Sequence, residues 1–286
     1  MMPSTVSTAD GVRVAIHDLG GRGPVVLLAH ATGFHGHVWE PLAADLIDRY
    51  HCVAFDHRGH GDSDRPGPGG FAWRGYAEDT TAVADVVVSS EQGRRPLGVG
   101  HSMGGTCLLL AEARRPGTFG ALALFEPVVF PPLPDVAAGP NALAEATRRR
   151  RADFPSLAEA EANYGSKPPM DTFDPAALSA YVRHGFRPDA GGGVTLKCRP
   201  EDEALTYENG PDSGAWDSLG EVACPVLVIR GAQDTPGPAW FAAEVAARLP
   251  HGQLHADDSL GHFGPLEHPH PLAVVIGTFF ASLRSS

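Results

Sequence analysis

Short apolar runs of strand length recur along the chain, and segments with helical periodicity separate them. The runs cover residues 25–29, 52–55, 97–99, 121–125 and 226–229. Most of them are apolar on both faces, which is typical of parallel strands buried inside a sheet. A helical pattern over residues 106–115 ends at Pro116 and Gly117. This alternation predicts an α/β fold with a mostly parallel sheet that helices cover on both faces.

The beginning of the chain has a different pattern. Polar and apolar positions alternate with period two near Val6 and over residues 12–17. Period two is the signature of a half-buried strand, so we predict an antiparallel edge to the sheet here.

The strand pattern lapses in the middle of the chain. Three helical patterns occur there, over residues 142–151, 157–164 and 175–184, and loops rich in Pro and Gly join them. A structureless loop of this length is uncommon in a compact domain. We therefore predict a core of residues 1–130 and 219–286, with a helical cap inserted as residues 131–218.

The composition supports a large core and excludes two classes of partner. The chain has 286 residues, of which 43% are hydrophobic, and a formal net charge of −12. The apolar content argues against disorder, and the acidic balance argues against binding nucleic acid. No run approaches the roughly 20 apolar residues that cross a bilayer, and residues 1–10 lack the apolar run of a signal peptide. We expect a soluble, cytoplasmic protein that does not bind membranes.

Cysteine and histidine spacing predicts no metal site. Four cysteines stand far apart in the sequence: Cys52, Cys107, Cys198 and Cys224. Four histidines cluster in sequence as two short pairs, His35 with His37 and His57 with His60. None of these has the spacing of a zinc site or a disulfide framework. We expect reduced thiols, no metal and no cofactor.

The strongest local motif is G-x-S-x-G at residues 100–104, directly after an apolar run and before a helical pattern. This context is the one in which a serine nucleophile sits on a sharp strand-to-helix turn. Such a turn leaves little room for side chains beside the serine, and Gly100 and Gly104 meet that need. We predict that Ser102 is a nucleophile at a helix N-terminus.

A serine nucleophile needs a base and an acid that orients the base. His262 precedes a closing amphipathic helix, and Asp234 follows the run at residues 226–229. The order Ser102, Asp234, His262 fits this type of fold, so we predict these three as the triad. Glu126 ends the run at residues 121–125 and is the alternative acid; we predict that it lines the site instead.

Four segments together resemble the α/β-hydrolase superfamily, in its serine-nucleophile branch with a helical cap after the sixth strand. They are residues 30–34, residues 56–63, the Ser102 turn, and Asp234 with His262. The resemblance implies an eight-stranded sheet and an acyl-enzyme on Ser102. Asp56, Arg58 and Ser63 are predicted to hold a turn by hydrogen bonds rather than to take part in catalysis.

The resemblance also implies an oxyanion hole made by the backbone amides of Met103 and Thr32. Ala31 stands where this family usually has glycine, so Ala31 and Gly33 remain alternatives to Thr32. Four further residues are predicted to bind substrate: Phe34, His101, Glu126 and Phe263.

These features predict a serine hydrolase for a carboxylic ester, thioester or lactone, whose small-molecule substrate is a medium-sized apolar or aromatic acyl compound. Four alternatives remain open: carbon–carbon hydrolysis of a β-diketone-like compound, amide hydrolysis, acyl transfer to an acceptor other than water, and a non-catalytic small-molecule receptor. The sequence does not predict an oligomeric state.

Overall fold

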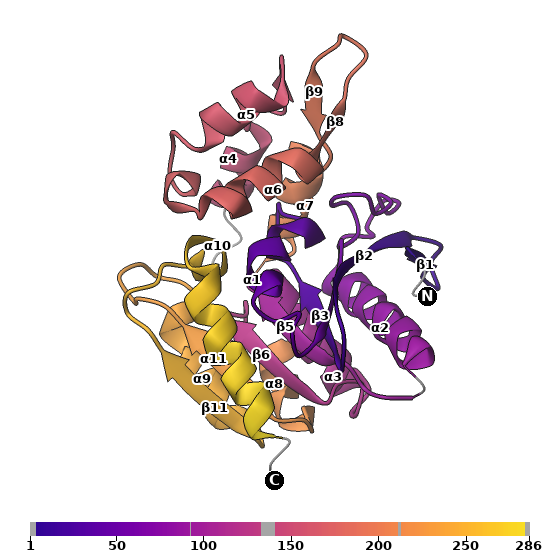
Figure 1. The fold of residues 1–286 in the computed structure, drawn as a ribbon, viewed down its shortest axis with the longest axis vertical. Helices are drawn as coiled ribbons and strands as arrows, with labels where there is room; N and C mark the ends of the chain where they lie inside the picture. The colour runs from indigo at the N-terminus through magenta and orange to yellow at the C-terminus, as the bar shows by residue number, and fades with distance from the viewer. Residues whose placement is uncertain (1–3, 92, 133–140, 211–212, 284–286) are drawn as a thin grey trace.

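The computed structural model describes residues 4–91, 93–132, 141–210 and 213–283, which form a core with a smaller cap on top of it (Figure 1). Within these ranges, no helix has both the length and the apolar content that crossing a bilayer requires.

An eight-stranded, mostly parallel sheet forms the centre of the core, which confirms the predicted fold. In spatial order its strands are β1 (Thr5–Ser7), β2 (Arg13–Gly21), β4 (His51–Phe55), β3 (Val25–Ala29), β5 (Leu97–His101), β6 (Ala121–Phe125), β10 (Val226–Arg230) and β11 (Gly252–Ala256). β2 pairs antiparallel with both β1 and β4, as predicted for this edge, and the other neighbours are parallel.

Helices bury both faces of the sheet. On β3, Val26 and Leu28 point to one apolar cluster, whereas Val25 and Leu27 point to the other. The first cluster includes residues of α1 (Glu40–Ala44) and α11 (Pro269–Ser282). The second includes residues of α2 (Trp73–Ser90), α3 (Met103–Arg114), α8 (Ala215–Ser218) and α9 (Ala242–Arg248). The double burial explains why these strands are apolar throughout.

The cap contains more than helices. Its helices are α4 (Ala142–Arg148), α5 (Leu157–Tyr164), η2 (Met170–Thr172), α6 (Pro175–Gly185) and α7 (Pro200–Glu208). It also has an antiparallel sheet of β7 (Asp153–Phe154), β9 (Val194–Leu196) and β8 (Phe186–Pro188). The purely helical prediction missed this sheet because strands of two or three residues are too short to show a period. In addition, α8 packs on α3, so it lies with the core although the predicted insertion included it.

Side-chain caps explain where the cap helices begin. The side chains of Asn141, Ser156 and Asp174 each accept hydrogen bonds from the first-turn amides of α4, α5 and α6. These residue types are the preferred N-caps because they satisfy amides that have no partner within the helix.

Asp56 holds the turn that follows β4, as the sequence predicted. Its carboxylate accepts hydrogen bonds from the amides of Gly36 at 2.6 Å and Asp62 at 2.7 Å. The hydroxyl of Ser63 lies 2.6 Å from the carbonyl oxygen of Asp56 and 2.8 Å from the amide of Ala15. These contacts tie the turn to β2 and to the loop after β3.

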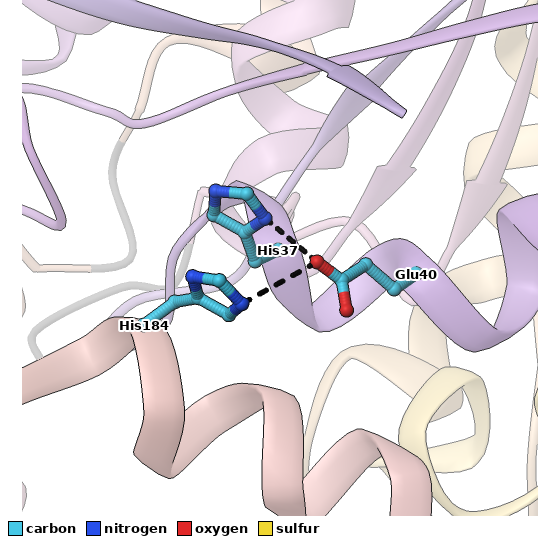
Figure 2. Close-up of side chains that lie close together, drawn as sticks. All are labelled: His37, Glu40 and His184. Carbon is cyan, nitrogen blue, oxygen red and sulfur yellow. Dashed lines mark hydrogen bonds and ion pairs between the residues drawn. The ribbon is translucent and has the colours of Figure 1, made fainter. Parts of the chain in front are cut away.

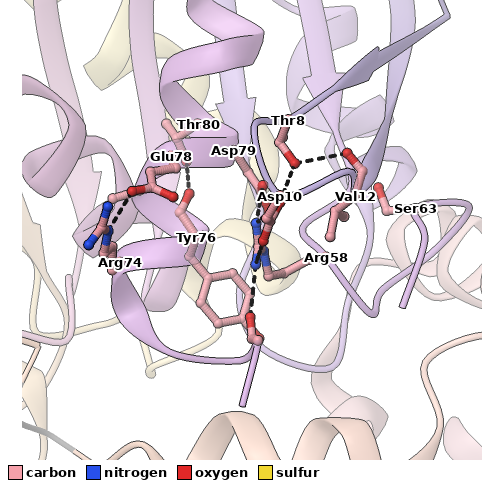
Figure 3. Close-up of polar contacts among 12 residues, drawn as sticks. Thr8, Asp10, Val12, Arg58, Ser63, Arg74, Tyr76, Glu78, Asp79 and Thr80 are labelled. Carbon is pink, nitrogen blue, oxygen red and sulfur yellow. Dashed lines mark hydrogen bonds and ion pairs between the residues drawn. The ribbon is translucent and has the colours of Figure 1, made fainter. Parts of the chain in front are cut away.

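Arg58 anchors the same turn to α2 and to the N-terminal hairpin (Figure 3). Its guanidinium binds both carboxylate oxygens of Asp79, at 2.6 and 2.7 Å, and lies 2.9 Å from Asp10. Arg58 is fully buried, and a buried guanidinium is tolerated only when it is paired in this way.

Candidate active site

Ser102 occupies the sharp turn between β5 and α3. Its backbone has φ 53° and ψ −118°, a conformation that side chains rarely adopt. A Cβ added at Gly100 would lie 2.6 Å from Cα of Gly105, and one at Gly104 would lie 2.2 Å from the carbonyl oxygen of Ala29. The two glycines are therefore required for the turn to close, and the turn places Ser102 at the N-terminus of α3.

His262 is paired with a buried carboxylate. Nδ1 of His262 lies 2.6 Å from Oε2 of Glu126, which follows β6 directly and is only 2% exposed. The other oxygen of Glu126 accepts a 2.8 Å hydrogen bond from the amide of Gly231. Because a carboxylate accepts the Nδ1 proton, Nε2 of the neutral ring is left free to act as a base.

Asp234 does not contact His262, so the predicted pairing of these two residues is wrong in this structure. Asp234 is exposed, and its nearest polar contact among the described residues is the hydroxyl of Thr235, at 3.5 Å.

The order of the strands explains the difference. β6 lies between β5 and β10, so the end of β6 is the closer of the two to Ser102. The loop after β10 is tied down at its start, where the amide of Ala232 bonds to the carbonyl oxygen of Leu260. Beyond that point residues 233–236, which include Asp234, are exposed. The sequence signal for Glu126 was present, since Glu126 ends an apolar run, but the run does not reveal its place in the sheet.

A cavity of about 390 Å³ opens beside the serine, between core and cap. Its wall includes Ser102, His262, Thr32, Met103 and Phe263 from the core. The cap contributes Leu143, Thr206 and Tyr207. The cavity wall thus contains the predicted nucleophile, the predicted base and both residues of the predicted oxyanion hole.

Three of the four residues predicted to bind substrate lie behind the cavity wall; only Phe263 lines the cavity. Phe34 is 6% exposed and packs against the rings of Phe173, Tyr181 and Phe263. Glu126 is buried against His262. For His101 the structure shows a contact that the sequence did not predict.

His101 supports the loop that carries His262. Nε2 of the buried His101 ring lies 2.8 Å from the backbone carbonyl oxygen of His262, to which it donates. Burial holds the pKa of His101 well below its ordinary value, and the nearby His262 lowers it further. A neutral ring that donates through Nε2 fixes the height of the His262 backbone over the sheet.

The amide of Thr32 is available to a ligand. No acceptor within the described ranges takes its hydrogen, and the Thr32 hydroxyl lies 3.3 Å from the Met103 sulfur. Positive φ falls on Gly33 (83°) and not on Ala31, so alanine costs nothing at that position.

The His30 ring holds the same loop through hydrogen bonds to two backbone groups. Its Nδ1 lies 2.7 Å from the carbonyl oxygen of Ala31, and its Nε2 accepts the amide of His57 at 3.0 Å. One nitrogen must donate and the other accept, which requires the neutral ring. Burial lowers the pKa of His30 well below its ordinary value and so favours that form.

The cap touches this loop through Glu203. A Cβ added at Gly33 would lie 2.4 Å from Oε1 of Glu203 on α7. Oε2 of the same carboxylate lies 2.6 Å from Arg150 Nη1, and the Arg150 guanidinium also contacts the hydroxyls of Tyr164 and Tyr181. A buried ion pair thus connects cap helices to the loop that carries Thr32.

A comparison with protein families agrees with this architecture. A family model described as the alpha/beta hydrolase family matches residues 25–275. The chain belongs to the alpha/beta hydrolase family. Solved structures of other proteins share its fold. The crystal structure of E-2-(acetamidomethylene)succinate hydrolase superimposes with a TM-score of 0.75 and 22% identity, over 97% of this chain and 98% of the other. The peroxisomal alpha-beta-hydrolase Lpx1 of Saccharomyces cerevisiae gives 0.81 and 19%, over 99% of this chain and 86% of the other.

Two relatives in sequence have named activities. The pimeloyl-(acyl-carrier protein) methyl ester esterase of Xanthomonas campestris pv. campestris is 30% identical over 285 residues, which cover 93% of this chain and 98% of the relative. The 2-(acetamidomethylene)succinate hydrolase of Mesorhizobium japonicum is 29% identical over 212 residues, which cover 74% and 71%.

Proposed function

We propose that this alpha/beta hydrolase is a serine esterase whose triad is Ser102, His262 and Glu126. The observation that carries the proposal is the 2.6 Å contact between Nδ1 of His262 and the buried carboxylate of Glu126, with Ser102 and His262 on one cavity wall. Glu126 takes the role that the sequence assigned to Asp234.

The chemistry is acyl transfer to water in two steps. Nε2 of His262 takes the proton from the Ser102 hydroxyl as its oxygen attacks the ester carbonyl carbon. The tetrahedral oxyanion accepts hydrogen bonds from the amides of Thr32 and Met103, each of which contributes about 3 kcal/mol. His262 then protonates the leaving alcohol. In the second step His262 takes a proton from water as the water oxygen attacks the acyl-enzyme, and it returns that proton to Ser102 when the acid leaves. Glu126 stabilises the imidazolium throughout.

The cavity favours an uncharged, mainly apolar ester. Among the described residues of its wall, His262 is the only acidic or basic side chain, and Phe130, Leu143 and Phe263 supply apolar surface. Desolvating a substrate carboxylate without a cationic partner is costly. The relative named as a methyl ester esterase supports an ester as the reacting group.

A fluorophosphonate probe tests the nucleophile without any assumption about the substrate. Intact-mass spectrometry should find one adduct on the wild-type protein and none on Ser102→Ala. Neutral esters of medium chain length should be hydrolysed by the wild type, and Ser102→Ala should lose nearly all of that turnover. Labelling or turnover that survives in Ser102→Ala would overturn the assignment.

A further inference from the structure

A second cluster of chemically reactive side chains lies at the junction of core and cap, outside the cavity. His37 belongs to η1 (Gly36–Trp39), Glu40 is the first residue of α1, and His184 lies near the end of cap helix α6. Nδ1 of His37 lies 2.8 Å, and Nε2 of His184 3.6 Å, from the same oxygen of Glu40 (Figure 2). All three side chains are partly exposed, so ions have access to them.

We propose that His37, Glu40 and His184 form a binding site for Zn²⁺ or a similar divalent transition metal. Imidazole nitrogens and carboxylate oxygens are the donors that zinc prefers in proteins, with bonds of 2.0–2.2 Å. Tetrahedral coordination at such bond lengths places donor atoms about 3.3 Å apart. The two nitrogen–oxygen distances of 2.8 and 3.6 Å lie on either side of this value, and the donor atoms of all three residues lie within 4.8 Å of one another.

The donor atoms are not engaged elsewhere. Within the described part of the chain, the ring nitrogens of His37 and His184 have no polar contact other than Glu40, and the second oxygen of Glu40 has no partner. The two imidazoles stack at 3.9 Å with 13° between their planes. A metal bound by both nitrogens therefore turns one ring out of the stack, which the exposure of His184 permits.

In a neighbouring cluster of one histidine and two aspartates, the carboxylates already have partners within the protein. Asp56 and Asp62 lie near His17, but the Asp56 carboxylate already accepts the amides of Gly36 and Asp62. Asp62 is also paired with the ammonium group of Lys197 at 2.7 Å. A protein cation thus takes the place that a metal would need there, whereas among the described residues no Lys or Arg side chain is paired with Glu40.

The site joins two parts of the molecule, because His184 comes from the cap and the other two ligands come from the core. None of the three lines the cavity, so the metal would tie the cap to the core and take no part in the Ser102 chemistry. This proposal does not depend on the proposed esterase activity. The sequence predicted no metal because the ligands come together only after folding.

Titration of the metal-stripped full chain with Zn²⁺ near pH 7.5 tests the site. We expect one Zn²⁺ per chain and a rise in melting temperature, since a ligand of the native state stabilises it. His37→Gln and His184→Gln should each weaken binding at least tenfold and abolish the rise. His270→Gln is the matched control, because His270 is also exposed and paired with a carboxylate, Asp45, elsewhere.

Loading with Co²⁺ provides a second readout, because its visible absorption reports tetrahedral ligation directly. If His184→Gln lowers the melting temperature of the metal-free protein, His184→Cys replaces it and should retain binding. The proposal is overturned if the wild type takes up no stoichiometric metal, or if the His37 and His184 variants bind it as the wild type does.

Discussion

Single residues on the loop after β3 decide where the Thr32 amide points. Gly33 has a φ of 83°, and the Glu203 carboxylate packs where its side chain would be. His30 and its two backbone partners fix the preceding residues. Ala31, the departure from the usual glycine, is harmless because the left-handed residue is Gly33. The sequence could name Gly33 as an alternative but could not say which residue takes the positive φ.

Gly33→Ala should therefore lower both stability and turnover. The positive φ and the clash with Glu203 should lower the free energy of unfolding by about 1–3 kcal/mol. Displacement of the Thr32 amide should lower kcat by about tenfold or more, because one oxyanion donor is worth 10²–10³. Urea unfolding and ester turnover measure the two effects.

Gly220→Ala is the control for that experiment. Gly220 has no neighbouring atom within 4 Å of an added Cβ and no positive φ. Its substitution should leave both quantities near wild type. A Gly33→Ala protein with normal kcat would show that this loop does not form the oxyanion hole.

The elements of the core follow from periodicity, whereas their spatial order does not. The apolar runs at β3, β4, β5, β6 and β10 and the helical patterns at α5 and α6 were all predictable from local sequence. The place of β6 beside β5 was not, and this place makes Glu126 rather than Asp234 the partner of His262. Long-range neighbours depend on how the whole sheet is ordered, and no window of sequence contains that order.

A mostly buried ion pair joins two segments of the cap. Arg150 follows α4 and binds Glu203 of α7, with both side chains mostly buried. Arg150→Met should lower the free energy of unfolding by about 3–5 kcal/mol, because it leaves the Glu203 carboxylate buried without a partner. The double variant Arg150→Met/Glu203→Gln should recover part of that loss. Urea unfolding of the three variants measures the coupling.

Arg148→Met, at the last residue of α4, is the matched control. Arg148 pairs with Glu145, Glu201 and Glu208, all of which are exposed. Its loss should change stability far less than the loss of Arg150. Equal effects of the two substitutions would contradict the role assigned to the buried pair.

At the scale of the whole molecule, five histidines are buried. They lie below the loops at the sheet edge: His30, His35, His57, His60 and His101. Burial lowers the pKa of each ring, to about 4 for His35 and about 3 for His57. The neutral rings fill space and fix loops, so the fold depends on their staying unprotonated.

Stability should therefore fall on acidification. In the unfolded chain these rings titrate near pH 6.5, so below that pH the unfolded state binds protons that the folded state does not. Each such histidine removes up to about 1.4 kcal/mol per pH unit between pH 6.5 and its folded pKa. Three groups act in the opposite direction, because their pKa values are raised in the folded state: His17 by its hydrogen bond to Asp56, His270 by Asp45, and Asp79 by burial. They are three groups against five.

Urea unfolding between pH 7.5 and pH 5 measures this dependence. His35→Gln can keep a donor for the carbonyl oxygen of Tyr181, which lies 3.0 Å from Nε2 of His35, and should make the slope shallower by about one proton. A free energy of unfolding that stays flat over this range would contradict the account of the buried rings.

The central claim is that Glu126, and not Asp234, orients His262, and kcat/KM for a neutral ester tests it most directly. We compare Glu126→Gln, Asp234→Asn and the wild type at pH 7.5. The buried contact predicts a loss on the order of 10⁴ in Glu126→Gln, as expected when the orienting carboxylate is removed, and near wild-type activity in Asp234→Asn. A large loss in Asp234→Asn with an active Glu126→Gln would contradict the account and restore Asp234 as the acid.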